Sequence, residues 1–243
     1  MCGIAGIYHL PTPKPVDPLR VERMCDAMVH RGTDGGGVWT APGVGLGHRR
    51  LSIIDVAGSP PPMASSDGRA MLVFNGAIYN YRELRQELRG LGAEFRTDGD
   101  SEVILAAWQR WGPDCLPRLH GMFAFAIYDT AERTLFLARD RVGIRPLYYN
   151  TENGIFTFAS EIKSIFVRDK VRPELSSENL AQIFTFWTAL SPNTAFRNIF
   201  ELSPGHCLTY SKKGLRIYKY WELQYGDPEQ SLTLEKALTQ FNE

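Results

Sequence analysis

Two short apolar runs separated by a tight turn constrain the fold of this chain more than any other feature. The first run, MFAFAIY, covers residues 122–128, and the second, TLFLA, covers residues 134–138. The five residues between them, DTAER, suffice for a hairpin loop, whereas a parallel crossover needs about a dozen residues or more. Strands joined in this way run antiparallel, so the pattern favours antiparallel sheets over a repeated parallel arrangement.

Other segments extend this pattern into a chain that mixes strands and helices. Further apolar runs predict strands at residues 4–8, 70–74, 155–159 and 215–221. Apolar residues recurring three and four positions apart predict helices within residues 17–30, 80–92, 100–112, 159–166 and 176–187. Asp17 is the expected N-cap of the first helix, with Pro18 in its first turn. The sequence therefore predicts an α/β (α+β) fold with helices on the outer faces of antiparallel sheets.

The composition is that of an ordinary soluble globular protein. Of the 243 residues, 44% are hydrophobic and 22% are charged. Lys plus Arg and Asp plus Glu each number 27, so no net charge recruits nucleic acid or an anionic membrane. The sequence has no apolar run of ~18 residues, the length of a membrane-spanning helix, and no secretory signal. We therefore expect a cytoplasmic protein that binds neither nucleic acid nor membrane.

The cysteines separate into one at the N-terminus and three inside the chain. Cys25, Cys115 and Cys207 are scattered, without a C-x-x-C pair or zinc-ligand spacing, and are expected to be buried thiols in a reducing compartment. Cys2 differs, because removal of Met1 would place its thiol and a free α-amine on one residue. That amine, with a pKa near ~7.7–8.0, could accept the thiol proton, so Cys2 is either an N-terminal nucleophile or a small residue entering a strand.

Three polar segments could serve such a nucleophile. Arg49 and Arg50 precede the apolar stretch of HRRLSIID, and either could be a surface charge or a bidentate partner of a carboxylate. In LVFNGAIYN a predicted strand runs into Asn75–Gly76 and then directly into a helix. Asn-Gly is commonly a turn, but an amide followed by a glycine N–H also supplies the two donors of an oxyanion hole. Asp100, at the start of a helix, could be a cap, a ligand contact or both.

These segments belong to a longer series of blocks: MCGIAG, HRGTDGGG, HRRLSIID, FNGAIYNYREL, TDGDSEVIL, GMFAFAIYD, RDRVGIRPLYY and FASEIKS. In this order they resemble the class II glutamine amidotransferase domain of asparagine synthetases, over roughly residues 1–210. The resemblance implies a four-layer αββα N-terminal-nucleophile hydrolase sandwich with two antiparallel sheets. It also implies hydrolysis of L-glutamine to glutamate, with ammonia passed to a synthetase domain that forms asparagine from aspartate.

The resemblance also assigns roles to individual residues. It implies that Cys2 is the nucleophile and that its own α-amine is the base. Asn75, through its side chain, and Gly76, through its N–H, correspond to the oxyanion hole. Arg50 corresponds to the partner of the glutamine α-carboxylate, and Asp100 to the acceptor for the glutamine α-amine.

Further parts of the glutamine pocket follow from the same resemblance. Backbone groups around Ser52, Ile53, Ile54 and Gly99 are expected to line it. The glycine-rich segment RGTDGGG, residues 31–37, is expected to be a mobile loop that closes over bound glutamine, because its glycines permit hinge motion.

One position departs from the family pattern. The usual block reads NGE-IYN, with a glutamate that helps to recognise the substrate amino group, and here Ala77 replaces it. We expect weaker glutamine binding with a smaller effect on turnover. The hydrolysis step needs no cofactor, whereas ATP and Mg²⁺ are expected only in a synthetase domain, whose S-G-G-x-D-S loop does not occur in this sequence.

The C-terminal part is expected to lie outside the amidotransferase domain. Residues 211–243 are interpreted as a final strand, a linker and either a solvated helix or the start of a following synthetase domain. The expected partners are L-glutamine and an ammonia-accepting synthetase domain, in cis or in trans, and a homodimer is possible. RDRVGIRPLYY is expected to form a structural loop near the face that meets the synthetase domain.

Two alternatives share the fold. The chain could supply ammonia to a different acceptor, as in polysaccharide or natural-product amidation, or it could be a non-catalytic scaffold. The joint presence of Cys2, Arg50, Asn75, Gly76 and Asp100 argues against the scaffold. A class I amidotransferase is disfavoured, because no internal cysteine has a G-x-C-x-G setting and the five histidines are scattered, each expected to be structural.

Overall fold

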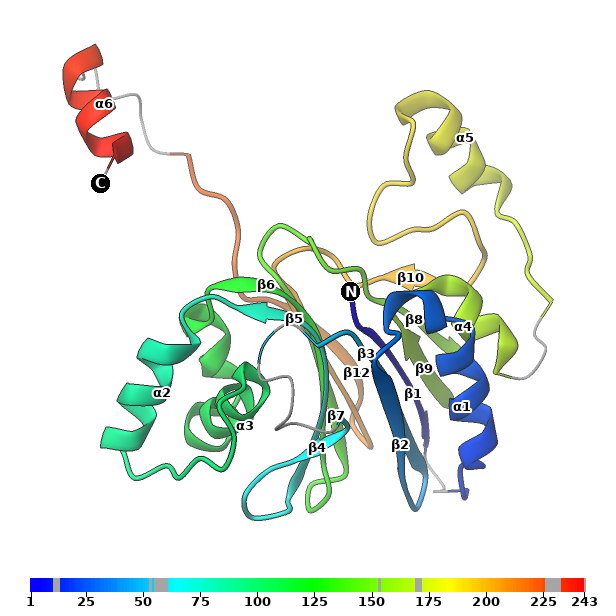
Figure 1. Cartoon of the computed structure of the whole chain (residues 1–243). Coiled ribbons are helices and arrows are strands. Elements are labelled where there is room, and N and C mark those ends of the chain that lie inside the picture. The colour runs from blue at the N-terminus through cyan, green and yellow to red at the C-terminus, as the bar shows by residue number, and fades with distance from the viewer. Residues whose placement is uncertain are drawn as a thin grey trace.

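Two antiparallel sheets packed face to face form the centre of the molecule (Figure 1). The computed structural model describes residues 1–10, 14–52, 54, 61–152, 154–168, 172–225 and 233–242. The first sheet has the strand order β10-β8-β9-β1-β3-β2, and the second has the order β12-β11-β7-β6-β5-β4. The antiparallel arrangement expected from the hairpin pattern is thereby confirmed.

The strands have the following bounds. The first sheet consists of β1 (Gly3–His9), β2 (Gly35–Ala41), β3 (Val44–Arg50), β8 (Tyr148–Glu152), β9 (Ile155–Ala159) and β10 (Phe200–Glu201). The second consists of β4 (Met63–Ala64), β5 (Ala70–Ile78), β6 (Gly121–Asp129), β7 (Thr134–Arg139), β11 (His206–Ser211) and β12 (Gly214–Lys219).

The described residues form six α-helices, of which the first four cover the outer faces of the sheets, whereas the last two bury none of their residues and project away from the sheets (Figure 1). They are α1 (Pro18–Asp26), α2 (Tyr81–Gly90), α3 (Asp100–Trp111), α4 (Ile162–Val167), α5 (Ser177–Phe186) and α6 (Leu234–Asn242), with short 3₁₀ helices at η1 (Val29–Arg31) and η2 (Gly112–Arg118). Asp17 caps α1 as expected, since its carboxylate accepts the N–H of Leu19. None of the helices formed by the described residues is long and apolar enough to cross a membrane.

Three apolar cores separate four layers. The core between the sheets contains inward side chains of both, including Ile4, Leu46, Val73, Leu137 and Phe158. A second core lies between the second sheet and helices α2 and α3, and a third between the first sheet and helices α1 and α4. Helix, sheet, sheet and helix therefore follow one another, which confirms the expected four-layer sandwich.

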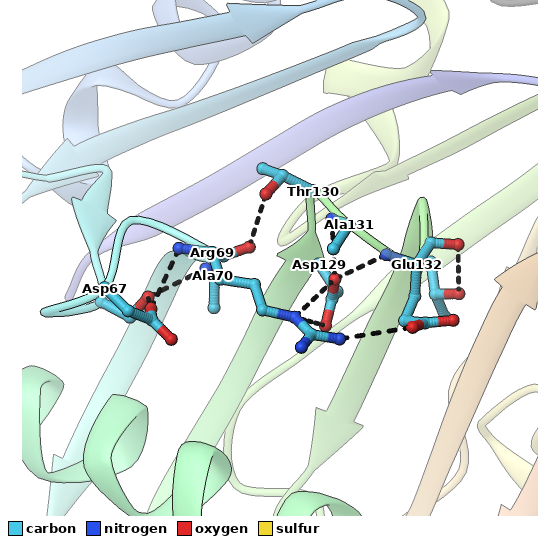
Figure 2. Close-up of polar contacts among 9 residues, drawn as sticks. Asp67, Arg69, Ala70, Asp129, Thr130, Ala131 and Glu132 are labelled. Carbon is cyan, nitrogen blue, oxygen red and sulfur yellow. Dashed lines mark hydrogen bonds and ion pairs between the residues drawn. The ribbon is translucent and has the colours of Figure 1, made fainter.

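Polar contacts join two turns at one end of the second sheet (Figure 2). The Arg69 guanidinium, in the turn before β5, pairs with the carboxylate of Asp129, at the end of β6. Thr130 donates its hydroxyl to the Arg69 carbonyl, and Asp129 accepts the N–H groups of Ala131 and Glu132. The contacts join the N-terminal end of β5 to the β6–β7 hairpin. The opposite end of β5 carries Asn75 and Gly76.

Several sequence-based expectations about local structure were wrong. Asn75 and Gly76 do not form a turn, because β5 continues through them to Ile78 and pairs with β6. The paired arginines do not precede a strand but form the end of β3, with Arg50 as its last residue. The N-cap position of α3 is Gly99, and Asp100 is the first helical residue. The strands β2, β3, β4, β8, β10 and β11 were not predicted.

The glycine-rich segment also differs from expectation. Gly35–Gly37 form the first part of β2, paired with the end of β3, rather than a loop of hinges. A Cβ at Gly36 would lie 2.4 Å from the His48 carbonyl oxygen, and one at Gly37 would lie 2.4 Å from that of Pro61. Close backbone approach therefore accounts for these two glycines.

Candidate active site

The Cys2 thiol lies where the ends of β1 and β3 meet. β1 pairs with β3 in a register that sets Gly3 opposite Arg49, which brings Cys2 to the C-terminal end of β3. Its Sγ accepts the Leu51 N–H at 3.4 Å and lies 3.5 Å from the Leu51 carbonyl oxygen. Burial raises the pKa of the thiol, while the Leu51 backbone and the positive charges of the N-terminus and Arg50 act in the opposite direction. Cys2 is thus held in place and protonated in the chain that carries Met1.

The main chain of Cys2 is fixed by a cation that sequence reasoning did not single out. The Arg31 Nε donates to the Cys2 carbonyl at 2.9 Å, and its Nη1 lies 3.1 Å from Glu161 Oε1. His30 and Lys163 contact the same carboxylate, at 2.9 and 3.0 Å. Although burial acts to raise it, these hydrogen bonds hold the pKa of Glu161 below its usual value. The sequence did contain a signal for this cluster, because its four residues lie in two of the blocks that carry the family resemblance, HRGTDGGG and FASEIKS.

A cavity opens beside Cys2 and brings most of the expected pocket residues together. Those lining it are Cys2, Arg50, Ile54, Gly76, Gly99 and Asp100, accompanied by Leu51, Met63, Leu72 and Phe74 among others. They come from both sheets and from the start of α3. The cavity therefore joins a thiol, a guanidinium and a carboxylate that are far apart in the sequence.

The N–H of Gly76 points away from β6, toward the edge of β5 that β4 covers only in part among the described residues. Phe123, its partner on β6, gives its own N–H to the Asp140 carboxylate and accepts the Asp140 N–H, so these groups face β7. Because backbone groups alternate in direction along an antiparallel ladder, the N–H and C=O of Gly76 face the other side. There the short β4 pairs only with Met71 and Leu72.

Two prolines limit how far the described part of β4 pairs along this edge. Pro61 and Pro62 precede β4 and have no N–H with which to extend its ladder along β5. At Gly76 itself, a Cβ would lie 2.1 Å from the Met122 carbonyl oxygen, so no larger residue fits. Gly76 lines the cavity, and no strand formed by the described residues pairs with its N–H.

The Asn75 side chain is completely buried, and neither its Nδ2 nor its Oδ1 has a hydrogen-bond partner among the described residues. Burying an amide without partners costs free energy, about 1–3 kcal/mol per unsatisfied group. A native position that retains such a group is typically one where a ligand completes its hydrogen bonds.

Asp100 contacts the same strand edge, two residues beyond Gly76. Its Oδ2 accepts the Ile78 N–H at 3.0 Å, and the side chain is buried. Burial raises the pKa of this carboxyl, partly offset by backbone hydrogen bonds. Arg85 of α2 supports the turn before it, donating to the carbonyls of Thr97 and Gly99. Asp100 is therefore set at the rim of the cavity by helix α2 as well as by α3.

The remaining expected residues lie around the cavity in different ways. Ser52 gives its N–H to the exposed Asp34 carboxylate at 2.8 Å, and this hydrogen bond holds the pKa of Asp34 below its usual value. Ile54 lines the cavity, whereas Ile53 lies outside the described residues. Ala77 is buried opposite Met122 of β6 and does not line the cavity.

His48 lines the cavity although it was expected to be structural. It lies on β3, is 6% exposed, and neither ring nitrogen has a hydrogen-bond partner among the described residues. Burial, with a smaller effect from Arg50, lowers its pKa to about 3, so the imidazole is neutral at pH 7. Across the described ranges, no three His, Cys, Asp or Glu residues are grouped closely enough to hold a metal ion.

The loop after β7 is organised around one buried carboxylate. Asp140 is fully buried and accepts the N–H groups of Phe123, Val142, Ile144 and Arg145 at 2.9–3.2 Å. Arg139 closes the loop from the other side, donating to the carbonyls of Gly143, Arg145 and Leu202.

Replacing Asp140 with alanine is expected to lower the free energy of unfolding by about 3 kcal/mol or more, since buried N–H groups bonded to a charge would lose their acceptor. Chemical denaturation of the variant would measure the loss. Asp114→Ala, at an exposed position in η2, is the matched control and should leave the midpoint denaturant concentration at its wild-type value. Equal midpoints for the two variants would contradict the role given to Asp140.

The fold and the N-terminal thiol with its cavity define a class of protein. The glutamine phosphoribosylpyrophosphate (PRPP) amidotransferase from B. subtilis, solved with ADP and GMP, superposes with a TM-score of 0.68 over 90% of this chain and 49% of that chain. Sequence identity is 20%, so this likeness concerns the fold alone. The fold is that of the N-terminal-nucleophile amidotransferases.

The sequence narrows the class to a family. The glutamine amidotransferase domain family matches residues 1–221, and the chain belongs to that family. Asparagine synthetase [glutamine-hydrolyzing] 3 of Bacillus subtilis (strain 168) is 37% identical over 227 residues, which are 92% of this chain and 37% of that protein. Asparagine synthetase B [glutamine-hydrolyzing] of Escherichia coli (strain K12) is 39% identical over 166 residues, 68% of this chain and 30% of that protein. The chain spans about a third of the length of these relatives.

Proposed function

We propose that this domain hydrolyses L-glutamine and supplies the ammonia to a synthetase that forms asparagine. One observation carries the proposal: the Cys2 thiol opens onto a cavity lined also by a guanidinium, a carboxylate and Gly76, whose N–H pairs with none of the described strands. The names of the asparagine synthetases that it resembles support the same reaction.

The cavity has the charges that an α-amino acid requires. Arg50 is the proposed partner of the substrate α-carboxylate, because a planar guanidinium can hold it through two parallel hydrogen bonds. Asp100 is the proposed acceptor for the α-ammonium group. With both ends of the amino acid held, the γ-carboxamide would extend toward Cys2. Backbone groups near Ser52, Ile53, Ile54 and Gly99 would complete the pocket.

The chemistry proceeds in two halves. The processed Cys2 passes its thiol proton to its own α-amine, and the thiolate attacks the γ-carboxamide carbon. The Asn75 side chain and the Gly76 N–H hold the resulting oxyanion. Collapse of this intermediate expels ammonia, which takes the proton from the α-amine, and leaves a γ-glutamyl thioester. Water then attacks the thioester and releases glutamate.

We assign no cofactor to this half-reaction. ATP and Mg²⁺ would belong to the synthetase, in cis or in trans, which activates the acceptor. We place the boundary of the amidotransferase domain at residues 1–210, with residues 211–243 providing the last strand, a linker and the start of a following domain. The four unpaired cysteines support a cytoplasmic location, and a homodimer stays a prediction.

The direct test combines turnover with labelling. The processed protein should release glutamate from L-glutamine, and a thiol-alkylating glutamine analogue should block turnover while adding one label at Cys2, located by peptide mass. A competing excess of glutamine should slow the labelling. If turnover and Cys2 labelling are both absent, the protein is a scaffold with this fold.

An alternative acceptor remains compatible with every residue of the cavity, because the acceptor binds to the synthetase. Glutamine hydrolysis would then proceed equally well, and aspartate would not be amidated when the synthetase is supplied. Product analysis with labelled glutamine nitrogen distinguishes the acceptors.

Ala77→Glu is expected to lower the KM for glutamine with little change in kcat. The resemblance implies that the family's glutamate at this position helps to hold the substrate amino group. Ala77 itself does not line the cavity, so the longer glutamate side chain would act by reaching the cavity from β5. Steady-state glutaminase kinetics would measure the effect, with Ala77→Gln as the matched control that adds length without charge. An unchanged KM in the glutamate variant would contradict this role.

A further inference from the structure

A buried cation lies beside the N-terminus without a carboxylate partner among the described residues. The Arg145 side chain is 6% exposed, and no ion pair forms from it in the described part of the chain. Its Nη1 donates to the Met1 thioether sulfur, its Nη2 lies 3.0 Å from the sulfur of Met122, and its Nε has no partner. Thioether sulfurs are weak acceptors, so the guanidinium is poorly satisfied for a buried charge.

The loop fixes this side chain in place. The Arg145 N–H donates to Asp140 at 2.9 Å, and its carbonyl accepts from the Arg139 Nε at 2.8 Å. With both backbone groups held by buried charged residues, the side chain leaves the loop in one direction, toward Met1. Its position is therefore specified by the fold rather than by a contact with a counter-ion.

The charges around Cys2 are mainly positive. Arg31 approaches from η1, Arg50 from β3 and Arg145 from the loop after β7. The carboxylates in the neighbourhood are those of Glu161, which pairs with Arg31, of the buried Asp140, and of two residues nearer the cavity, Asp34 and Asp100.

Strands β5 and β6 add no charge near Arg145. Ala77 lies directly opposite Met122, so the family's glutamate position provides no counter-ion here. The buried Asp140 carboxylate is bonded to the Arg145 backbone, but among the described residues no carboxylate pairs with the Arg145 guanidinium itself.

We propose that Arg145 is a positioning residue for the N-terminal nucleophile, keeping the α-amine of processed Cys2 in its neutral, proton-accepting form and favouring the thiolate. This inference rests on the proposed function. An arginine can only donate hydrogen bonds, and an ammonium group has no acceptor, whereas a neutral amine and a thiolate both accept. Removal of Met1 takes away one sulfur acceptor, so the guanidinium would favour these two accepting forms. In agreement, its charge acts to lower the pKa of the Cys2 thiol, against the larger effect of burial, which raises that pKa overall.

The same loop supplies a matched control. Arg141 donates to the Pro117 carbonyl at 2.9 Å and lies against the Trp221 ring, away from Cys2. Arg145→Met and Arg141→Met remove the same charge from the same loop. Arg145→Lys keeps the charge with a different shape, and Arg145→Gln keeps polar donors without the charge should the methionine variant fail to fold.

The experiment measures the pH profile of kcat/KM for glutamine hydrolysis by the processed proteins. Arg145→Met is expected to raise the apparent pKa of the acidic limb by about one unit, a loss of about ten-fold below that pKa with recovery at alkaline pH. Arg141→Met and Arg145→Lys should retain the wild-type profile. A merely structural role would lower the rate at every pH. If the apparent pKa of the acidic limb is the same as in the wild type in both Arg145→Met and Arg145→Gln, the inference is overturned.

A second measurement separates this inference from the proposed function. The rate of Cys2 alkylation by iodoacetamide against pH, followed by peptide mass, requires no glutamine hydrolysis. If the alkylation profile of Arg145→Met is displaced to higher pH than that of the wild type, the result supports the role of Arg145 even if no protein hydrolyses glutamine. A profile that coincides with wild type overturns that role, whether or not the wild-type enzyme turns over.

Discussion

Replacing Cys2 with alanine is expected to reduce glutamine hydrolysis to background, a loss of at least about 10⁴-fold in kcat. The variant loses the atom that would form the thioester, and the other cavity groups offer no substitute. His48 has neither a nucleophilic partner nor a charge at neutral pH. Arg50 and Asp100 remain, so the variant should still bind glutamine. Glutamate release measures the first effect, and calorimetric titration measures the second.

The control for this substitution is another cysteine. Cys207 lies on β11, is buried, and burial raises its pKa to about 11. Cys207→Ala should hydrolyse glutamine at close to the wild-type rate. Sustained turnover in the Cys2 variant, or loss of turnover in both variants together, would contradict the assignment of Cys2 as the nucleophile.

A chain that retains Met1 is expected to hydrolyse glutamine about 10²–10⁴-fold more slowly than the processed chain, the usual contribution of a general base. With Met1 attached, the nitrogen of Cys2 belongs to a peptide bond, where its lone pair is delocalised and accepts no proton. Burial meanwhile keeps the thiol protonated.

A cleavable N-terminal extension tests this expectation on one preparation. Turnover is measured before and after a protease exposes Cys2 as the first residue, with intact mass reporting the state of the terminus. An extension placed after the C-terminus and removed in the same way controls for the cleavage. Full turnover in the uncleaved protein would show that the base lies elsewhere.

The fold could be predicted largely because its central strands are apolar and joined by short turns. Residues 122–128 and 134–138 became β6 and β7, paired as the hairpin required. Strands β2 and β3 escaped prediction because Gly35–Gly37 and the VGLGHRR run lack β-branched alternation. Close backbone packing stabilises these glycines in the sheet, and a single sequence does not display such packing.

For the candidate site, the sequence predicted which residues lie together better than it predicted the local structure that holds them. Cys2, Arg50, Gly76 and Asp100 line one cavity as the resemblance implied, but the Asn-Gly pair lies within a strand. The turn interpretation failed because local preference for a turn was overridden by pairing with β6. Arg31 and Arg145 were not singled out, and His48 was interpreted as structural, because a buried cation or imidazole has the same letter in the sequence as an exposed one.

The shortness of β4 has a consequence for how the domain would meet its substrate. A sheet recognises an added strand through free N–H and C=O groups along its edge. Past Pro62, the margin of β5 offers such groups at Gly76, and the γ-carboxamide of glutamine carries the same carbonyl acceptor as a peptide bond. Bound glutamine would therefore make with β5, at Gly76, the kind of hydrogen bond that an added strand makes with the edge of a sheet.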